Sequence, residues 1–139
     1  GKMSDRQYFN SGLEDDDSSM RFWCATGLGQ LSGGEEDVKA LEKAGKDNSA
    51  TVRIAAAGSL GRLGQTRSAV AILTDILKQD HPHQLIMQRA VEALDDIGKP
   101  AAAALDLVKK VRGGTENRFL QRLCDHFIET VETTGKSDD

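Results

Sequence analysis

The chain has 139 residues, and its 18 Lys and Arg against 22 Asp and Glu give a formal net charge of −4. This length predicts a single domain that can bury a core without disulfide bonds. An apolar run of about 18 residues, which a membrane span needs, is missing from the sequence. The mildly acidic balance argues against nucleic acid as the main partner. Cys24 and Cys124 form neither a disulfide framework nor a zinc-binding pattern.

One pattern of apolar, small and polar residues recurs four times along the chain, at a spacing of 32 to 34 residues. The four copies are Met20–Leu31, Val52–Leu63, Ile86–Ile97 and Leu120–Val131. Each copy repeats its apolar residues with the period of a helix. Second amphipathic segments lie between them, at Glu35–Ala44, Ser68–Lys78 and Pro100–Val111. The sequence therefore predicts an all-α fold, a right-handed α-solenoid of about four helix pairs in an α-α superhelix.

The segment boundaries carry residues that are typical of helix ends. We expect Ser49 to cap the second copy and Thr115 to cap the fourth. Gly64 and Gly98 follow the last apolar residue of their helices, where a residue with positive φ is favoured. The expected organisation is a capping or linker segment at 1–14, a repeat domain at 15–132 and a disordered tail at 133–139.

The second copy has the clearest motif, Val-Arg-x-Ala-Ala-x-x-x-Leu-Gly-x-Leu-Gly at residues 52–64, preceded by Asp47. This motif resembles HEAT repeats, in particular the short, Ala-rich type also found in phycobilisome lyases. The resemblance extends from about Asp15 to Val131 and implies the same armadillo-like superhelix that the periodicity predicts.

In HEAT repeats, an Asp in the turn and an Arg six residues later form a hydrogen-bonded ladder between successive repeats. The resemblance implies this structural role for two pairs, Asp15 with Arg21 and Asp47 with Arg53. Later copies depart from the pattern at His81, Met87 and Gln121. We therefore expect the ladder to end after two rungs.

The first copy carries a narrower resemblance. In Met20–Leu28, Arg21 is followed by Phe22, Trp23, a small residue and Ala25. This stretch is similar to the opening of HEAT domains found C-terminal to the catalytic domain of some bacterial sulfatases. The resemblance implies an accessory domain of a larger exported hydrolase, in the periplasm or outside the cell. Without it, a cytoplasmic location is expected.

The second helix of each HEAT pair lines the concave surface of the array, where solenoids bind their partners. The resemblance thus implies a partner-binding face that comprises Trp23, Thr26, Gln30, Arg62, Arg89, Glu92, Asp96 and His126. Two interpretations of Trp23 remain open. Either the N-terminal segment with Tyr8, Phe9 and Leu13 folds over the indole as a cap, or Trp23 anchors a partner or a preceding domain.

Patterns that carry chemistry are weak in this sequence. The acidic run at 14–17 lacks the spacing of a calcium-binding loop, and His81 and His83 have no third ligand in the sequence. When the four copies are aligned, both cysteines fall in one column, meaning one equivalent position, which is alanine in the other two copies. Both are therefore expected to be buried and unreactive. We therefore expect no catalytic, cofactor-binding or metal-binding residues and no cofactor, and a chain that is not itself an enzyme, although its parent protein is one if it is a sulfatase.

The leading hypothesis is a non-catalytic HEAT-repeat module for protein–protein interaction or scaffolding, in its narrower form the accessory domain of a sulfatase-type hydrolase. Its partner is another protein domain or subunit, with no nucleic acid or membrane partner, and the chain is expected to be a monomer. One alternative is a lyase-like subunit that handles a chromophore or small molecule in the concave groove. The other is a purely structural spacer.

Overall fold

The structure, a computed structural model, describes residues 3–31, 33–79 and 83–133. Within these ranges all regular elements are helical, and the expected all-α solenoid class is confirmed. The α-helices are α1 (Asp5–Gly12), α2 (Ser18–Leu28), α3 (Glu35–Ala44), α4 (Ala50–Arg62), α5 (Thr66–Lys78), α6 (Gln84–Ile97), α7 (Leu105–Gly113) and α8 (Arg118–Glu132), with a 3-10 helix η1 (Lys99–Ala104) before α7. No helix of the described ranges is long and apolar enough to cross a membrane.

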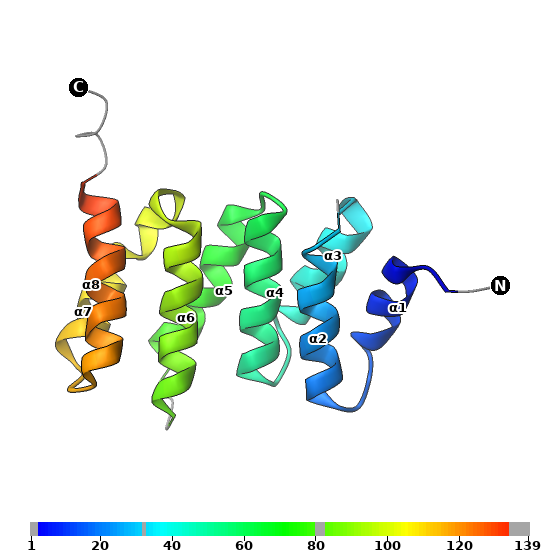
Figure 1. The fold of residues 1–139 in the computed structure, drawn as a ribbon, viewed down its shortest axis with the longest axis horizontal. Helices are drawn as coiled ribbons and strands as arrows, with labels where there is room; N and C mark the ends of the chain where they lie inside the picture. The colour runs from blue at the N-terminus through cyan, green and yellow to red at the C-terminus, as the bar shows by residue number, and fades with distance from the viewer. Residues whose placement is uncertain (1–2, 32, 80–82, 134–139) are drawn as a thin grey trace. The chain divides into compact units, whose positions relative to one another are not determined.

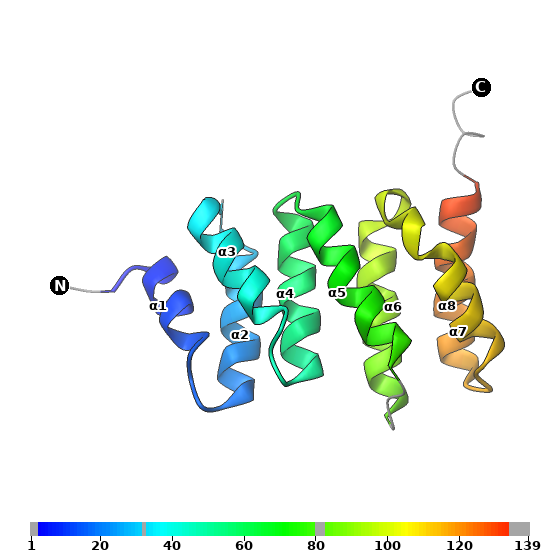
Figure 2. The ribbon, with the colours of Figure 1, turned by 180° about the vertical axis from the view of Figure 1, so that it is seen from behind.

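The chain divides into two compact units, Gly1–Ile72 and Leu73–Asp139, and the division falls within α5. In the N-terminal unit, α4 packs against both α2 and α3. Figure 1 shows α2 and α4 side by side with α3 behind them, and the opposite view in Figure 2 shows α3 in front. Helix α1 packs against α2.

The C-terminal unit repeats this arrangement within itself. Helix α8 packs against both α6 and α7, and η1 contacts all three. Figure 1 shows α6 and α8 side by side with α7 behind them. In each unit, the helices of the recurring pattern therefore form one row, and the intervening segments form a second layer.

Alanines lie among the larger Leu, Val and Ile side chains of the core in both units and let neighbouring helices approach closely. Ala25, Ala56, Ala57, Ala90 and Ala104 are all fully buried. Burial of both thiols is confirmed as well. Burial is the main cause that raises the pKa of the Cys24 thiol, and it raises that of Cys124 to about 11. Both thiols are therefore protonated at neutral pH, which removes their nucleophilic form.

Helix bounds agree with the periodicity to within about two residues, except at the end of the first copy, where α2 ends at Leu28 and not at Leu31, and before α7. The Glu35–Ala44 helix has the predicted bounds, but the predicted α-helix at Pro100–Val111 is wrong over residues 100–104. There the chain forms η1, with Pro100 in its first turn and Ala101 outside helical geometry at φ −91° and ψ 18°. Because Ala101 and Ala104 are fully buried, their methyl groups bring this tighter turn directly against the core.

The two expected glycines are confirmed in positive φ, Gly64 at 83° and Gly98 at 75°. Ser49 is the N-cap of α4, but its side chain bonds the Thr51 hydroxyl instead of a helix N–H group. The expectation that Thr115 caps α8 is wrong. The cap is Asn117, whose Oδ1 accepts the N–H of Leu120 at 3.0 Å, because Asx side chains reach the third amide readily.

The N-terminal segment contains a capped helix. Ser4 accepts the N–H of Gln7, and the Gln7 side chain accepts the N–H of Ser4, which forms a capping box at the start of α1. We retain the segment 1–14 as a proposed cap of the repeats. The predicted tail 133–139 lies outside the described residues, apart from Thr133, which is the C-cap of α8.

Candidate partner-binding surfaces

An arginine and an aspartate connect the first two copies of the repeat in the N-terminal unit. Arg21 Nε donates to Asp47 Oδ2 at 2.8 Å, and Arg21 Nη2 donates to Asp47 Oδ1 at 3.2 Å. The same guanidinium reaches back through Nη1 to the carbonyl oxygen of Asp15 at 2.8 Å. Arg21 thus holds two consecutive turns together by charge-assisted hydrogen bonds.

Asp47 also organises its own turn, because its Oδ1 accepts the N–H of Ser49 at 2.8 Å. Burial acts to raise the pKa of Asp47, but the hydrogen bonds from Arg21 and Ser49, together with the charges of Arg21 and Arg53, outweigh it. The pKa of Asp47 is therefore held below its usual value, and the carboxylate stays ionised down to mildly acidic pH.

The fourth copy forms a neutral version of the same turn. Gln121 occupies the position that is arginine in the first two copies, and its side chain donates to the carbonyl oxygen of Thr115 at 2.7 Å. The Thr115 hydroxyl accepts the N–H of Asn117 at 3.1 Å. The buried Nε of Arg53 has no hydrogen-bond partner among the described residues. His81 lies outside them, so the end of the ladder at that position stays a prediction.

Trp23 lies on the outward side of α2 and is 66% exposed. Its indole meets the ring of Phe22 edge-on at a centroid distance of 5.7 Å. Of the two interpretations of Trp23, the one in which the N-terminal segment covers the indole is therefore wrong. Helix α1 packs on another side of α2, where a Cβ at Gly27 would come within 2.5 Å of the Phe9 ring, so the apolar residues of α1 cover Gly27 instead.

The rest of the predicted face in this unit is polar and open. We use the term Trp23 face for Trp23, Thr26, Gln30 and Arg62. Gln30 and Arg62 are exposed, while the Thr26 hydroxyl bonds the carbonyl oxygen of Phe22 at 3.0 Å. Arg62 forms no ion pair with another residue of the described ranges, so the face presents one aromatic ring and one uncompensated positive charge.

The C-terminal unit carries the other four predicted residues, which we call the His126 face: Arg89, Glu92, Asp96 and His126. Arg89 and Asp96 are exposed on α6 and Glu92 is half-buried. None of the three forms an ion pair with another described residue. His126 of α8 does, because its Nδ1 lies 2.7 Å from Oδ2 of Asp95 on α6.

The hydrogen bond and charge of Asp95 raise the pKa of His126, and Glu129 adds to this effect. A group with a raised folded-state pKa stabilises the fold below its unfolded pKa, and this contribution disappears as the pH rises through the raised value.

We expect Asp95→Asn to return the pKa of His126 toward about 6.5. We also expect it to lower the melting temperature at pH 5.5 but not at pH 8.5. NMR titration of the imidazole and thermal unfolding at the two pH values test both effects, and an equal loss of stability at both pH values contradicts them.

Sequence reasoning missed three residues of α6 and α8 that the structure brings into view. Asp95 of α6 was not among the residues expected on the partner-binding face, although it pairs with His126 of α8. Leu85 and Phe119 are exposed by 54% and 48% near the starts of the same two helices. The equivalent positions of the first two copies are Ser19 and Thr51. These polar residues were the signal that the position faces outward.

No group of three or more His, Cys, Asp or Glu side chains that could hold a metal ion occurs among residues 3–31, 33–79 and 83–133. Two of the acidic residues before α2 bond the backbone instead. Oδ1 of Asp17 accepts the N–H of Ser19, and Oδ1 of Asp15 accepts that of Asp17. Their arrangement is that of turn and helix-cap residues.

Comparison with known proteins supports the predicted type of repeat. A family model of HEAT repeats matches residues 44–122, while no curated protein matches the chain. Among solved structures, human deoxyhypusine hydroxylase in complex with glycerol is similar, with a TM-score of 0.63 and 24% identity over 95% of this chain. The match covers 45% of that protein, so the chain spans less than half of its length. The likeness shows the fold, a helical repeat scaffold.

This comparison corrects one expectation. We expected that the chain is not an enzyme because familiar catalytic motifs are missing from its sequence. That inference is wrong. A hydroxylase has the same fold over nearly the whole of this chain. The missing motifs therefore carry no weight against catalysis on this scaffold.

Proposed function

Because the chain belongs to the HEAT-repeat family, we propose that it is a protein-interaction module that binds another protein domain or subunit through the Trp23 face. The observation that carries this proposal is the 66% exposure of the indole. Trp is among the residues that contribute most to protein interfaces, because it buries a large area at little cost in side-chain entropy. Arg62, exposed and without an ion-pair partner in the described ranges, adds a second contact that favours a carboxylate on the partner.

A narrower form of the proposal names the partner as a catalytic domain of the same polypeptide. It is supported by the similarity of Met20–Leu28 to the opening of HEAT domains that follow bacterial sulfatase domains. The exposed Trp23 favours this form, because an uncovered aromatic ring at the first repeat is where a preceding domain would pack. In this form the module is an accessory domain of an exported sulfatase-type hydrolase.

Site-specific crosslinking tests the proposal directly. A photoreactive phenylalanine analogue replaces Trp23 in the full-length protein, produced in its native host, and the crosslinked peptides are identified by mass spectrometry. We expect a crosslink to one protein surface that disappears when Arg62→Glu is added. A crosslink within the same polypeptide supports the narrower form, and one to another protein supports a separate subunit and contradicts that form.

The matched control is the same analogue at Lys39, which is 72% exposed on α3 of the same unit. Its crosslinks should be sparse and insensitive to Arg62→Glu. If position 23 crosslinks no more than position 39, the interaction function is contradicted. Trp23→Ala should change the free energy of unfolding by less than about 0.5 kcal/mol, as for other exposed positions, so a loss of crosslinking is not a loss of folding.

A further inference from the structure

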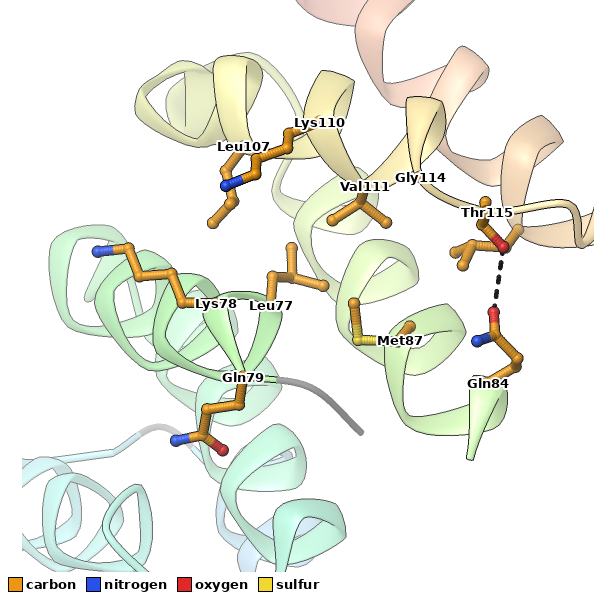
Figure 3. A pocket seen from close by; sticks show the side chains of 11 residues that line it. Leu77, Lys78, Gln79, Gln84, Met87, Leu107, Lys110, Val111, Gly114 and Thr115 are labelled. Carbon is orange, nitrogen blue, oxygen red and sulfur yellow. Dashed lines mark hydrogen bonds between the residues drawn. The ribbon is translucent and has the colours of Figure 1, made fainter. Parts of the chain in front are cut away.

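A cavity of about 390 Å³ lies within the C-terminal unit, between the end of α5, the start of α6 and the end of α7. Figure 3 shows it from close by. Its apolar part comprises Leu77, Met87, Leu107, Val111 and Leu120. This volume falls in the range of about 300–1,000 Å³ that small-molecule sites occupy. The cavity is separate from the His126 face, because none of the residues that define that face lines it.

Two lysines line this cavity from different helices, Lys78 from α5 and Lys110 from α7, and no acidic side chain is among its described lining residues. Neither lysine forms an ion pair with a described residue. Within the described part of the chain, the cavity therefore combines an apolar wall with two positive charges that no carboxylate compensates.

The ammonium group of Lys110 differs from its basic neighbours on α7, because those neighbours form ion pairs with α8. Lys109 pairs with Glu132 at 3.0 Å and Arg112 pairs with Asp125 at 2.9 Å, both carboxylates of α8. Lys110, between them in sequence, lines the cavity instead. Of the three basic residues at this end of α7, it is the one that has no carboxylate within the described part of the chain.

The remaining lining groups are neutral and polar. The Thr115 hydroxyl bonds the side-chain oxygen of Gln84 at 3.3 Å, as the dashed line in Figure 3 marks. That bond leaves the amide nitrogen of Gln84 as a donor, and Gln79 contributes a second side-chain amide. Donors thus outnumber acceptors around an apolar wall, which is the chemistry that recognises a carboxylate carried on a hydrocarbon body.

We propose that this cavity is a binding site for a small organic monocarboxylic acid with an apolar body. The carboxylate lies between Lys78 and Lys110, and the hydrocarbon packs against Met87 and Val111. The site is independent of the Trp23 face, which belongs to the other unit, so it extends the proposed function and does not depend on it.

Calorimetric titration of the full chain with octanoate tests this assignment, with octanol and octylamine as probes of equal length. We expect octanoate to bind more tightly than both. We also expect Lys78→Met with Lys110→Met to weaken it by at least about tenfold, since each charge-assisted hydrogen bond contributes that much or more. The methionines keep the length of the side chain and remove its charge.

Two further variants separate this site from general charge effects. Lys99→Met makes the same change at an exposed lysine of the same unit outside the cavity and should leave the affinity for octanoate unchanged. Met87→Trp fills the cavity and should abolish binding. Because Met87→Trp risks poor folding, the surface lysine variants decide the question. The assignment is overturned if wild type binds octanoate no better than octanol, or if the double lysine variant binds it as wild type does.

Discussion

Asp47→Ala is expected to lower the free energy of unfolding by about 2 kcal/mol, because it removes the charge-assisted hydrogen bonds of a part-buried ion pair. The Asp47 carboxylate is only 13% exposed, and its partner Arg21 is 14% exposed. Removing the carboxylate leaves Arg21 Nε without its acceptor and releases the N–H of Ser49 at the start of α4. Urea unfolding monitored by far-UV circular dichroism measures the loss.

The matched control is Glu14→Ala, which breaks the ion pair between Glu14 and Lys43 in the same unit. That pair is 3.0 Å long, but its side chains are 68% and 75% exposed. Exposed pairs contribute about 0–1 kcal/mol, so this variant should be nearly as stable as wild type. Similar losses in the two variants would falsify the role assigned to burial.

The effect of Asp47→Ala should also depend on pH. Because the pKa of Asp47 is lowered in the folded protein, its contribution is complete above the unfolded-state pKa of about 3.9 and disappears as the pH falls through the folded value. The stability difference between wild type and Asp47→Ala should therefore be constant between pH 5 and 8 and shrink below pH 4. A difference that stays constant down to pH 2.5 argues that the carboxylate acts through packing alone.

Periodicity was enough to predict the helices because apolar and small residues recur at helical spacing in every copy. It could not predict η1, since the alanines at 101–104 suit an α-helix equally well in isolation. Only the burial of Ala101 and Ala104 against neighbouring helices favours the tighter turn. The bound of α7 was thus decided by packing, which a single sequence does not display.

The candidate surfaces were less predictable than the fold. Trp23 shares its column with Ala55, Arg89 and Leu123, so the column itself does not indicate whether the position is covered. Whether α1 covers the indole depends on the side of α2 against which it packs. The ion pair of His126 with Asp95 and the cavity between α5 and α7 depend on the register between helices far apart in sequence. These features follow from the assembled helices and not from any one of them.

The same substitution at two glycines is expected to have opposite effects on stability. Gly29 caps the end of α2 at φ −69°, which any residue adopts, yet a Cβ there would lie 2.7 Å from the Cβ and 2.9 Å from the Cα of Ser59. Because Ser59 is fully buried in α4 and its hydroxyl donates to the carbonyl oxygen of Ala25 at 2.6 Å, it cannot move aside. Gly29→Ala should therefore destabilise the protein by about 1–3 kcal/mol, the usual cost of overpacking.

Gly58, in the interior of α4, has open space where a Cβ would lie, with no neighbouring atom within 4 Å of that position. Gly58→Ala should therefore stabilise the protein by up to about 1 kcal/mol, the difference in helix propensity between the two residues. Chemical denaturation of both variants, with the double variant to check additivity, measures the two signs. Stabilisation by Gly29→Ala would mean that α2 and α4 lie farther apart than described, and the close packing of the first two copies would have to be given up. Destabilisation by Gly58→Ala would instead mean that something covers the open side of α4, next to the Trp23 face.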